Sequence, residues 1–134
     1  MPYIRKDRMK KLLVLLGLVL LVGCGPKKVD TAQLAKGNDL VSAGKFDEGI
    51  AVLDELGKQN ADDPALKQAR IAAHLKFANY YMTDESVDRK IKYRSALKHY
   101  RIVLSLDASN AEAKSSADLI IGIYNQMGRP VPTE

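Results

Sequence analysis

The only cysteine of the chain, Cys24, is the residue best suited to nucleophilic chemistry, because a thiolate is a strong nucleophile. Three apolar or small residues directly precede it: Leu21, Val22 and Gly23. Gly23 has no bulky side chain, so the backbone at this position could enter the active site of a signal-cleaving peptidase. An apolar run over residues 12–22 follows five basic residues, Arg5, Lys6, Arg8, Lys10 and Lys11. This order of basic, apolar and small residues is typical of a secretory signal.

The same stretch resembles the signal and lipobox of bacterial lipoproteins. The apolar run has 11 residues, whereas a membrane-spanning helix needs about 20, so we expect residues 1–23 to be removed. The resemblance implies cleavage between Gly23 and Cys24, a diacylglycerol joined to the thiol, and a fatty acid such as palmitate on the freed amine. A buried cysteine after an uncleaved anchor is the alternative. Met9 begins a compact signal of its own, so Met1 and Met9 are both candidate start residues.

Removal of residues 1–23 changes the charge more than the length. The mature chain keeps 16 of 21 basic and 15 of 16 acidic residues, so the net charge falls from +5 to +1. This balance does not predict nucleic-acid binding, which needs a basic surface on the mature domain. With Cys24 committed to lipid, the mature chain has no thiol left for an internal disulfide or a metal site, and we expect a single domain held together by packing.

The two histidines do not form a recognisable catalytic or metal-binding pattern. His74 and His99 are 25 residues apart on different expected helices, and neither has a second histidine or an acid at the spacing that a metal-binding helix uses. We therefore expect two partly solvated surface histidines. The chain also has no glycine-rich phosphate loop. The sequence predicts neither an enzyme nor a metal or cofactor site.

The densest basic run is expected to be a solvated helix face, balanced by the acidic residues Asp84, Glu85 and Asp88. An acidic partner or anionic lipid is the alternative ligand for this face. The basic residues are Lys90, Lys92, Arg94, Lys98 and Arg101.

Apolar residues recur at three- and four-residue spacing after the tether, which predicts an all-α mature chain. We expect a lipidated tether at residues 24–30, a helical domain at 31–128 and a C-terminal tail at 129–134. The expected helices cover residues 31–43, 46–59, 64–82 and 91–106, and a fifth follows residue 109 and ends before Gly128.

Local signals place several of these boundaries. Asp63 before Pro64 starts a helix well, and Ser109 with Glu112 has capping-box spacing. Gly44 is the expected stop of the first helix. The apolar residues of the third helix lie nearly all round it, as expected for an element that packs on more than one side. Residues 83–90 are the expected loop, and 130–134 are expected to be disordered.

Two segments, residues 44–53 and 91–100, have the same order of side chains. Each puts an aromatic residue first (Phe46 or Tyr93), a small residue three later and a large apolar residue four beyond that. This pattern resembles the tetratricopeptide repeat, a helical hairpin of about 34 residues. The family's signature positions fall on Gly37, Leu40, Gly49 and Leu53 in the first unit and on Ala72, Leu75, Ala96 and Tyr100 in the second.

The resemblance implies about five helices arranged as antiparallel hairpins, with two repeats and a capping helix. The chain departs from the family in lacking tryptophan, and Phe46 and Tyr93 are 47 residues apart. A long third helix and the charged loop explain this excess. Asp118 stands where a third unit needs a small residue, so the fifth helix is expected to be a polar cap. A plain antiparallel bundle is the alternative.

The resemblance implies an envelope adaptor that binds a protein or peptide partner or itself, and does not bind nucleic acid. Lipoproteins of this kind are similar to accessory factors of secretion, pilus assembly and outer-membrane assembly. Gly25 follows the cysteine where an aspartate would favour inner-membrane retention, so we expect the outer membrane, facing the periplasm. A non-catalytic subunit of an envelope enzyme, or a small-ligand binder, is the alternative.

The first helix of each hairpin lines the binding groove in this family, and this gives the candidate contact residues. Phe77, Tyr80 and Tyr81 form an aromatic stripe on the third helix, with core packing expected for two of the three. Asn38 stands where some members hold a peptide carboxylate. Leu34 and Ala73 occupy other positions of that clamp, so we do not expect carboxylate clamping.

Overall fold

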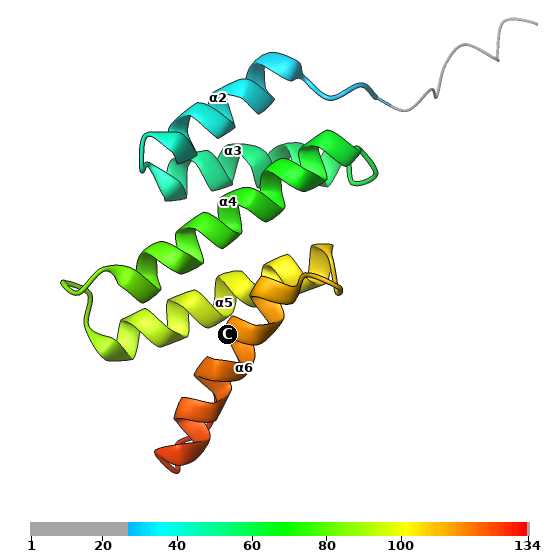
Figure 1. Cartoon of the computed structure of the whole chain (residues 1–134). Helices are drawn as coiled ribbons and strands as arrows, with labels where there is room; N and C mark the ends of the chain where they lie inside the picture. Colours follow the sequence, from blue (N-terminus) through cyan, green and yellow to red (C-terminus); the bar gives the residue numbers. More distant parts are fainter. Residues whose placement is uncertain (1–26, 134) are drawn as a thin grey trace, which may run out of the picture.

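The computed structural model describes residues 27–133, and the expected signal, lipobox and Cys24 lie outside this range. The described part is all-α, as predicted, and contains no strand. Its five helices are α2 (Thr31–Ser42), α3 (Phe46–Gln59), α4 (Pro64–Thr83), α5 (Arg89–Leu106) and α6 (Ala111–Gln126). They form two antiparallel hairpins, α2–α3 and α4–α5, followed by α6 (Figure 1).

Side-chain caps explain why the helices begin where they do. Asp63 accepts a hydrogen bond from the Leu66 amide at 2.8 Å and places Pro64 at the first position of α4. Asp88 accepts from the Lys90 amide at 2.8 Å, so α5 begins at Arg89, two residues earlier than predicted.

The predicted capping box at the start of α6 is wrong. Asn110, and not Ser109, caps the helix by accepting from the Ala113 amide at 2.9 Å. The Ser109 amide and hydroxyl instead both donate to Asp107. An aspartate side chain commonly accepts a hydrogen bond from the backbone two residues later and so forms a local turn. Glu112 accepts a hydrogen bond from the Asn79 side chain on α4 at 2.7 Å.

Gly37 and Gly49 allow α2 and α3 to approach each other closely, as predicted. A Cβ at Gly49 would lie 2.6 Å from Val41 Cγ2 and 2.8 Å from the Gly37 carbonyl oxygen, and a Cβ at Gly37 would lie 2.7 Å from Leu53 Cδ2. Neither glycine leaves room for a methyl group. Gly44 ends the hairpin turn with a φ of 79°, which favours glycine.

The second hairpin uses one of the two small residues that were predicted for it. Ala72 is exposed, so it cannot be the close-approach position of α4. Ala78 takes this role, and it is completely buried in the cluster between α4 and α5 together with Ala96, the small residue predicted on α5. The predicted position is wrong because the register of the 20-residue α4 against α5 places Ala78, and not Ala72, at the contact.

Helix α4 belongs to two buried clusters, which confirms that it packs on more than one side. Leu66, Ala73 and Phe77 pack with residues of α2 and α3, whereas Ile71 and Ala78 pack with α5 and α6. Figure 1 shows α4 between the first hairpin and α5. Helix α6 packs mostly against α5. The core therefore runs through the whole stack, with α4 at its centre.

The C-terminal segment folds back against α5, in contrast to the disorder expected for residues 130–134. Gly128 reverses the chain with a φ of 62°. Val131 packs against the α4–α6 cluster, and Arg101 donates a hydrogen bond to the Pro132 carbonyl oxygen. Among residues 27–133, no helix is both long and apolar enough to cross a membrane.

Candidate partner-binding site

A cluster of aromatic rings lies where the start of α3 meets the second half of α4. Phe46 stacks on Phe77 with ring centroids 4.8 Å apart and an interplanar angle of 14°. Tyr80 lies 5.3 Å from Phe46, and Tyr81 lies 4.7 Å from Phe77. His99 of α5 completes the cluster at 4.6 Å from Phe77. Three helices thus hold these rings in fixed positions.

The structure brings the predicted stripe of Phe77, Tyr80 and Tyr81 together, and the three rings have different roles. Phe77 is 5% exposed and belongs to the core. Tyr81 is half-buried and packs against both clusters. Tyr80 is 42% exposed. Core packing for two of the three is therefore confirmed, and Tyr80 presents the open edge of the cluster.

Asp84 fixes the orientation of the Tyr80 ring at the end of α4. The Tyr80 hydroxyl donates a hydrogen bond to the Asp84 carboxylate, which raises the pKa of Tyr80. The same bond, together with bonds from Ser86, lowers the pKa of Asp84 to about 2. The exposed aromatic face is consequently held by polar contacts as well as by packing.

Asn38 does not join this cluster. Its side chain is exposed on α2 and makes no hydrogen bond with another residue of the described range. Phe46 and His99 were missed as members of the cluster. Phe46 had a sequence signal, because it is the aromatic residue that opens the first repeated segment, whereas the position of His99 depends on the register of α5 against α4.

A polar chain runs beside the rings and joins α3, α4 and α5. Arg70 Nε donates to Asp54 Oδ1 at 2.8 Å, and His74 Nε2 lies 3.4 Å from Asp54. His74 Nδ1 lies 2.9 Å from His99 Nδ1. His74 is 1% exposed, so the prediction of a surface histidine is wrong for this residue. Burial of His74 follows from the apolar surroundings of α4 on both sides.

Burial and neighbouring charges set the protonation of this chain. Burial lowers the pKa of His99 to about 4, and His74 acts in the same direction. Burial opposes ionisation of Asp54, but hydrogen bonds from His74 and Arg70 outweigh it and lower the pKa of Asp54. Asp54 is therefore ionised and His99 neutral near pH 7. The bond between the two Nδ1 atoms needs one protonated and one unprotonated nitrogen, and a neutral His99 allows this.

The polar chain fits a structural tie better than a catalytic or metal-binding centre. It links the two hairpins through Asp54 and His74, and it satisfies the buried polar atoms of His74 on both sides of the ring. Within residues 27–133, no group of three or more histidine, cysteine, aspartate or glutamate side chains is arranged to hold a metal ion.

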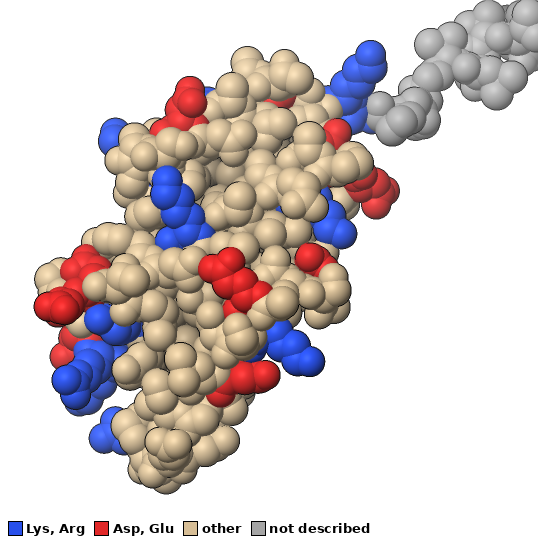
Figure 2. Space-filling view, in the orientation of Figure 1, with Lys and Arg blue, Asp and Glu red and all other residues tan. Residues whose placement is uncertain are grey.

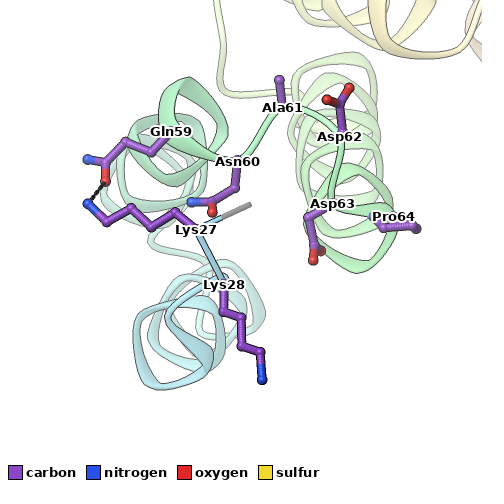
Figure 3. A pocket seen from close by; sticks show the side chains of 8 residues that line it. All are labelled: Lys27, Lys28, Gln59, Asn60, Ala61, Asp62, Asp63 and Pro64. Atoms are coloured by element: carbon purple, nitrogen blue, oxygen red, sulfur yellow. Dashed lines mark hydrogen bonds between the residues drawn. The ribbon is translucent and has the colours of Figure 1, made fainter. Parts of the chain in front are cut away.

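A polar hollow of about 450 Å³ lies where the tether meets the turn between α3 and α4 (Figure 3). Lys27 reaches across to Gln59, whose amide oxygen accepts a hydrogen bond at 3.4 Å, while Lys28 points away from that residue. Asp62 and Asp63 line the other side. Residues 27–30 therefore run past the end of α3 before α2 begins.

Comparisons of this chain with known protein families, with curated proteins and with solved structures found no match.

Proposed function

We propose that this protein is a lipid-anchored adaptor of the bacterial envelope, whose helical domain binds a protein partner through the exposed edge of the aromatic cluster. The observation that supports this best is the position of Tyr80. Its ring is 42% exposed, yet Phe46, Phe77 and Asp84 hold it in one orientation. Ordered aromatic side chains of this kind commonly contribute most to protein–protein interfaces.

The anchoring half of the proposal is supported by sequence alone. Leu21, Val22 and Gly23 precede Cys24 after an apolar run, which resembles a lipoprotein signal. Three acyl chains on Cys24 would exceed the two signals that stable membrane attachment needs. We place the protein at the periplasmic face of the outer membrane because Gly25 follows the cysteine.

The scaffold half of the proposal is that the two hairpins are a degenerate tetratricopeptide-like array. Gly37 and Gly49 sit at the contact between α2 and α3, and Ala78 and Ala96 are buried between α4 and α5. Small residues at both contacts support a repeated packing scheme. Two hairpins with a fifth helix are fewer than the three units that repeat arrays usually need, so a partner could cover a face that a third repeat would otherwise bury.

The proposal is tested by placing a photoreactive phenylalanine analogue at Tyr80 in the full-length protein in cells. Gln68 is the matched control position, since it is also exposed and lies on the same helix. We expect irradiation to give one crosslinked partner from position 80 and none from position 68. Tyr80→Ala should reduce co-isolation of that partner about tenfold, as an aromatic interface residue worth about 1.4 kcal/mol would.

Two outcomes would count against an adaptor. One is the same set of crosslinks from both positions, which would indicate random collisions. The other is a Tyr80→Ala variant that retains its partner at wild-type yield. Circular dichroism of each variant must show unchanged helicity, so that a loss of binding is not a loss of folding.

A further inference from the structure

A second surface lies between the first turn of α5 and the last turn of α6. The structure has a groove of about 450 Å³ there. Tyr93, Ile123, Tyr124 and Met127 provide its apolar surface. Met127 is 49% exposed. The floor of the groove is therefore suited to receive an apolar group.

The rim of this groove is positively charged. Arg89, Lys90 and Arg129 line it, together with Arg94, and none of the lining residues within 27–133 is acidic. Arg89, Lys90 and Arg129 form no salt bridge within residues 27–133. Figure 2 shows positive side chains gathered at the end of the molecule where α5 begins, with negative ones beside them.

Two of the three acidic residues that precede α5, Asp84 and Asp88, are already engaged in local contacts, and Glu85 does not line the groove. Asp88 caps α5 through the Lys90 amide. Asp84 accepts bonds from Tyr80 and Ser86. Among residues 27–133, no acidic residue lines the groove beside Arg89, Lys90 and Arg129.

We propose that this groove binds an acidic segment of a partner protein that carries apolar side chains. Carboxylates of the segment would pair with Arg89, Lys90 and Arg129, and an apolar side chain would lie against Tyr93 and Met127. Charge complementarity at a rim gives faster and more selective association, and a central apolar contact supplies the binding free energy. This inference rests on the proposal that the domain binds protein partners, and it names the chemistry of one such partner.

The position of the groove favours a protein over a lipid surface. In Figure 1 the chain enters the domain beside the right-hand end of α2, whereas the start of α5 and the end of α6 lie at the opposite end. If Cys24 is attached to a membrane, the groove lies at the end of the domain farther from the point of attachment. A protein segment can reach such a surface more easily than the headgroups of the anchoring membrane.

The test uses the full-length lipidated protein in non-ionic detergent and a fluorescent peptide of alternating glutamate and leucine. Matched peptides replace either all glutamates by glutamine or all leucines by serine. We expect the parent peptide to bind with an affinity that falls as salt rises and both matched peptides to bind more weakly. The double variant Lys90→Gln/Arg129→Gln should weaken binding about tenfold, because two exposed ion pairs in the usual range together account for a loss of that size. Met127→Ser should weaken it without changing the salt dependence.

Lys114→Gln is the matched control, because Lys114 is an exposed lysine of α6 outside the groove. It should bind like wild type. The inference is overturned if the parent peptide does not bind, or if the double variant binds it as tightly as the Lys114→Gln control. It is also overturned if anionic phospholipid vesicles that carry the same total negative charge as the peptide displace the peptide from the protein. Tyr80→Ala should leave peptide binding intact. If the peptide does not bind but the crosslink from position 80 persists, only the proposed peptide site in the groove is wrong. If the crosslink from position 80 is absent but the peptide binds, only the proposed partner site at Tyr80 is wrong.

Discussion

At the residue scale, the pair of His74 and His99 shows how burial can enforce a protonation state. His74 is surrounded by α3, α4 and α5 and has a hydrogen-bond partner at each ring nitrogen. A second proton on His99 would place a charge beside the rings of Phe77 and Tyr81, where little water can solvate it. The folded protein therefore favours a neutral His99.

This preference predicts that the protein becomes less stable as the pH falls from about 6.5 to about 4. The pKa of His99 is about 4 when folded and 6.5 when unfolded, so the unfolded chain binds more protons in that window and is favoured by acid. We expect the free energy of unfolding to fall by about 1–2 kcal/mol, since partial exposure of His99 reduces the full effect of its shift. Urea unfolding at pH 7 and at pH 4.5 measures this.

The variant His99→Gln separates this histidine from the other titrating groups. Its unfolding free energy should depend much less on pH in the same window. Asp54 and Asp84 have lowered pKa values, so their stabilising effect is present above about pH 4 and is lost only at more acidic pH. An identical decrease in wild type and His99→Gln would refute the assignment to His99.

At the element scale, glycines mark where helices touch and where they do not. Gly49 of α3 lies against Val41 and the Gly37 backbone of α2, within 3 Å of where a Cβ would sit. Gly122 lies in α6 and has no atom within 4 Å of its would-be Cβ. The same residue type therefore has opposite consequences in two helices.

This contrast predicts effects of opposite sign for the same substitution. Gly49→Ala should destabilise the protein by about 1–3 kcal/mol, because the added methyl group meets backbone atoms and must push α2 from α3. Gly122→Ala should stabilise it by about 0.5–1 kcal/mol, because alanine has the higher helix propensity. Urea midpoints of the two variants measure this, and a stabilised Gly49→Ala protein would show that the hairpin contact is wrong.

The helices themselves were largely predictable from local sequence. The spacing of apolar residues gave α2, α3 and α4 within a residue or so of their ends, because each helix is set by local periodicity and by caps such as Asp63. The start of α6 was assigned to the wrong cap, since Ser109 and Asn110 are both good capping residues and only the structure distinguishes them.

Contacts between helices were less predictable than the helices. The pairing of His74 with His99 depends on the register between α4 and α5, which residue spacing in one helix does not determine. The same uncertainty led to Ala72 in place of Ala78 at the helix contact. The packing of Val131 on the core was missed because five residues after a Gly128 turn carry too little apolar pattern to indicate where they dock.

At the scale of the whole molecule, the domain has two different ends. The described chain begins at the polar hollow formed by Lys27, Gln59 and Asp62. The basic groove and the exposed Met127 lie at the opposite end of the stack. A protein held to a membrane at one end and open to partners along its side and at its far end has the geometry that the proposed adaptor needs.

The proposed adaptor depends on Cys24 as its point of attachment, and the most direct measurement is the mass of the N-terminal peptide of the protein isolated from membranes. We predict a wild-type peptide that begins at Cys24 and carries a diacylglycerol on the thiol and a fatty acid on the amine. Cys24→Ser should retain the residues before position 24 and carry no lipid, because the chain has no other thiol. A wild-type peptide with an unmodified Cys24 still joined to Gly23 would contradict the account.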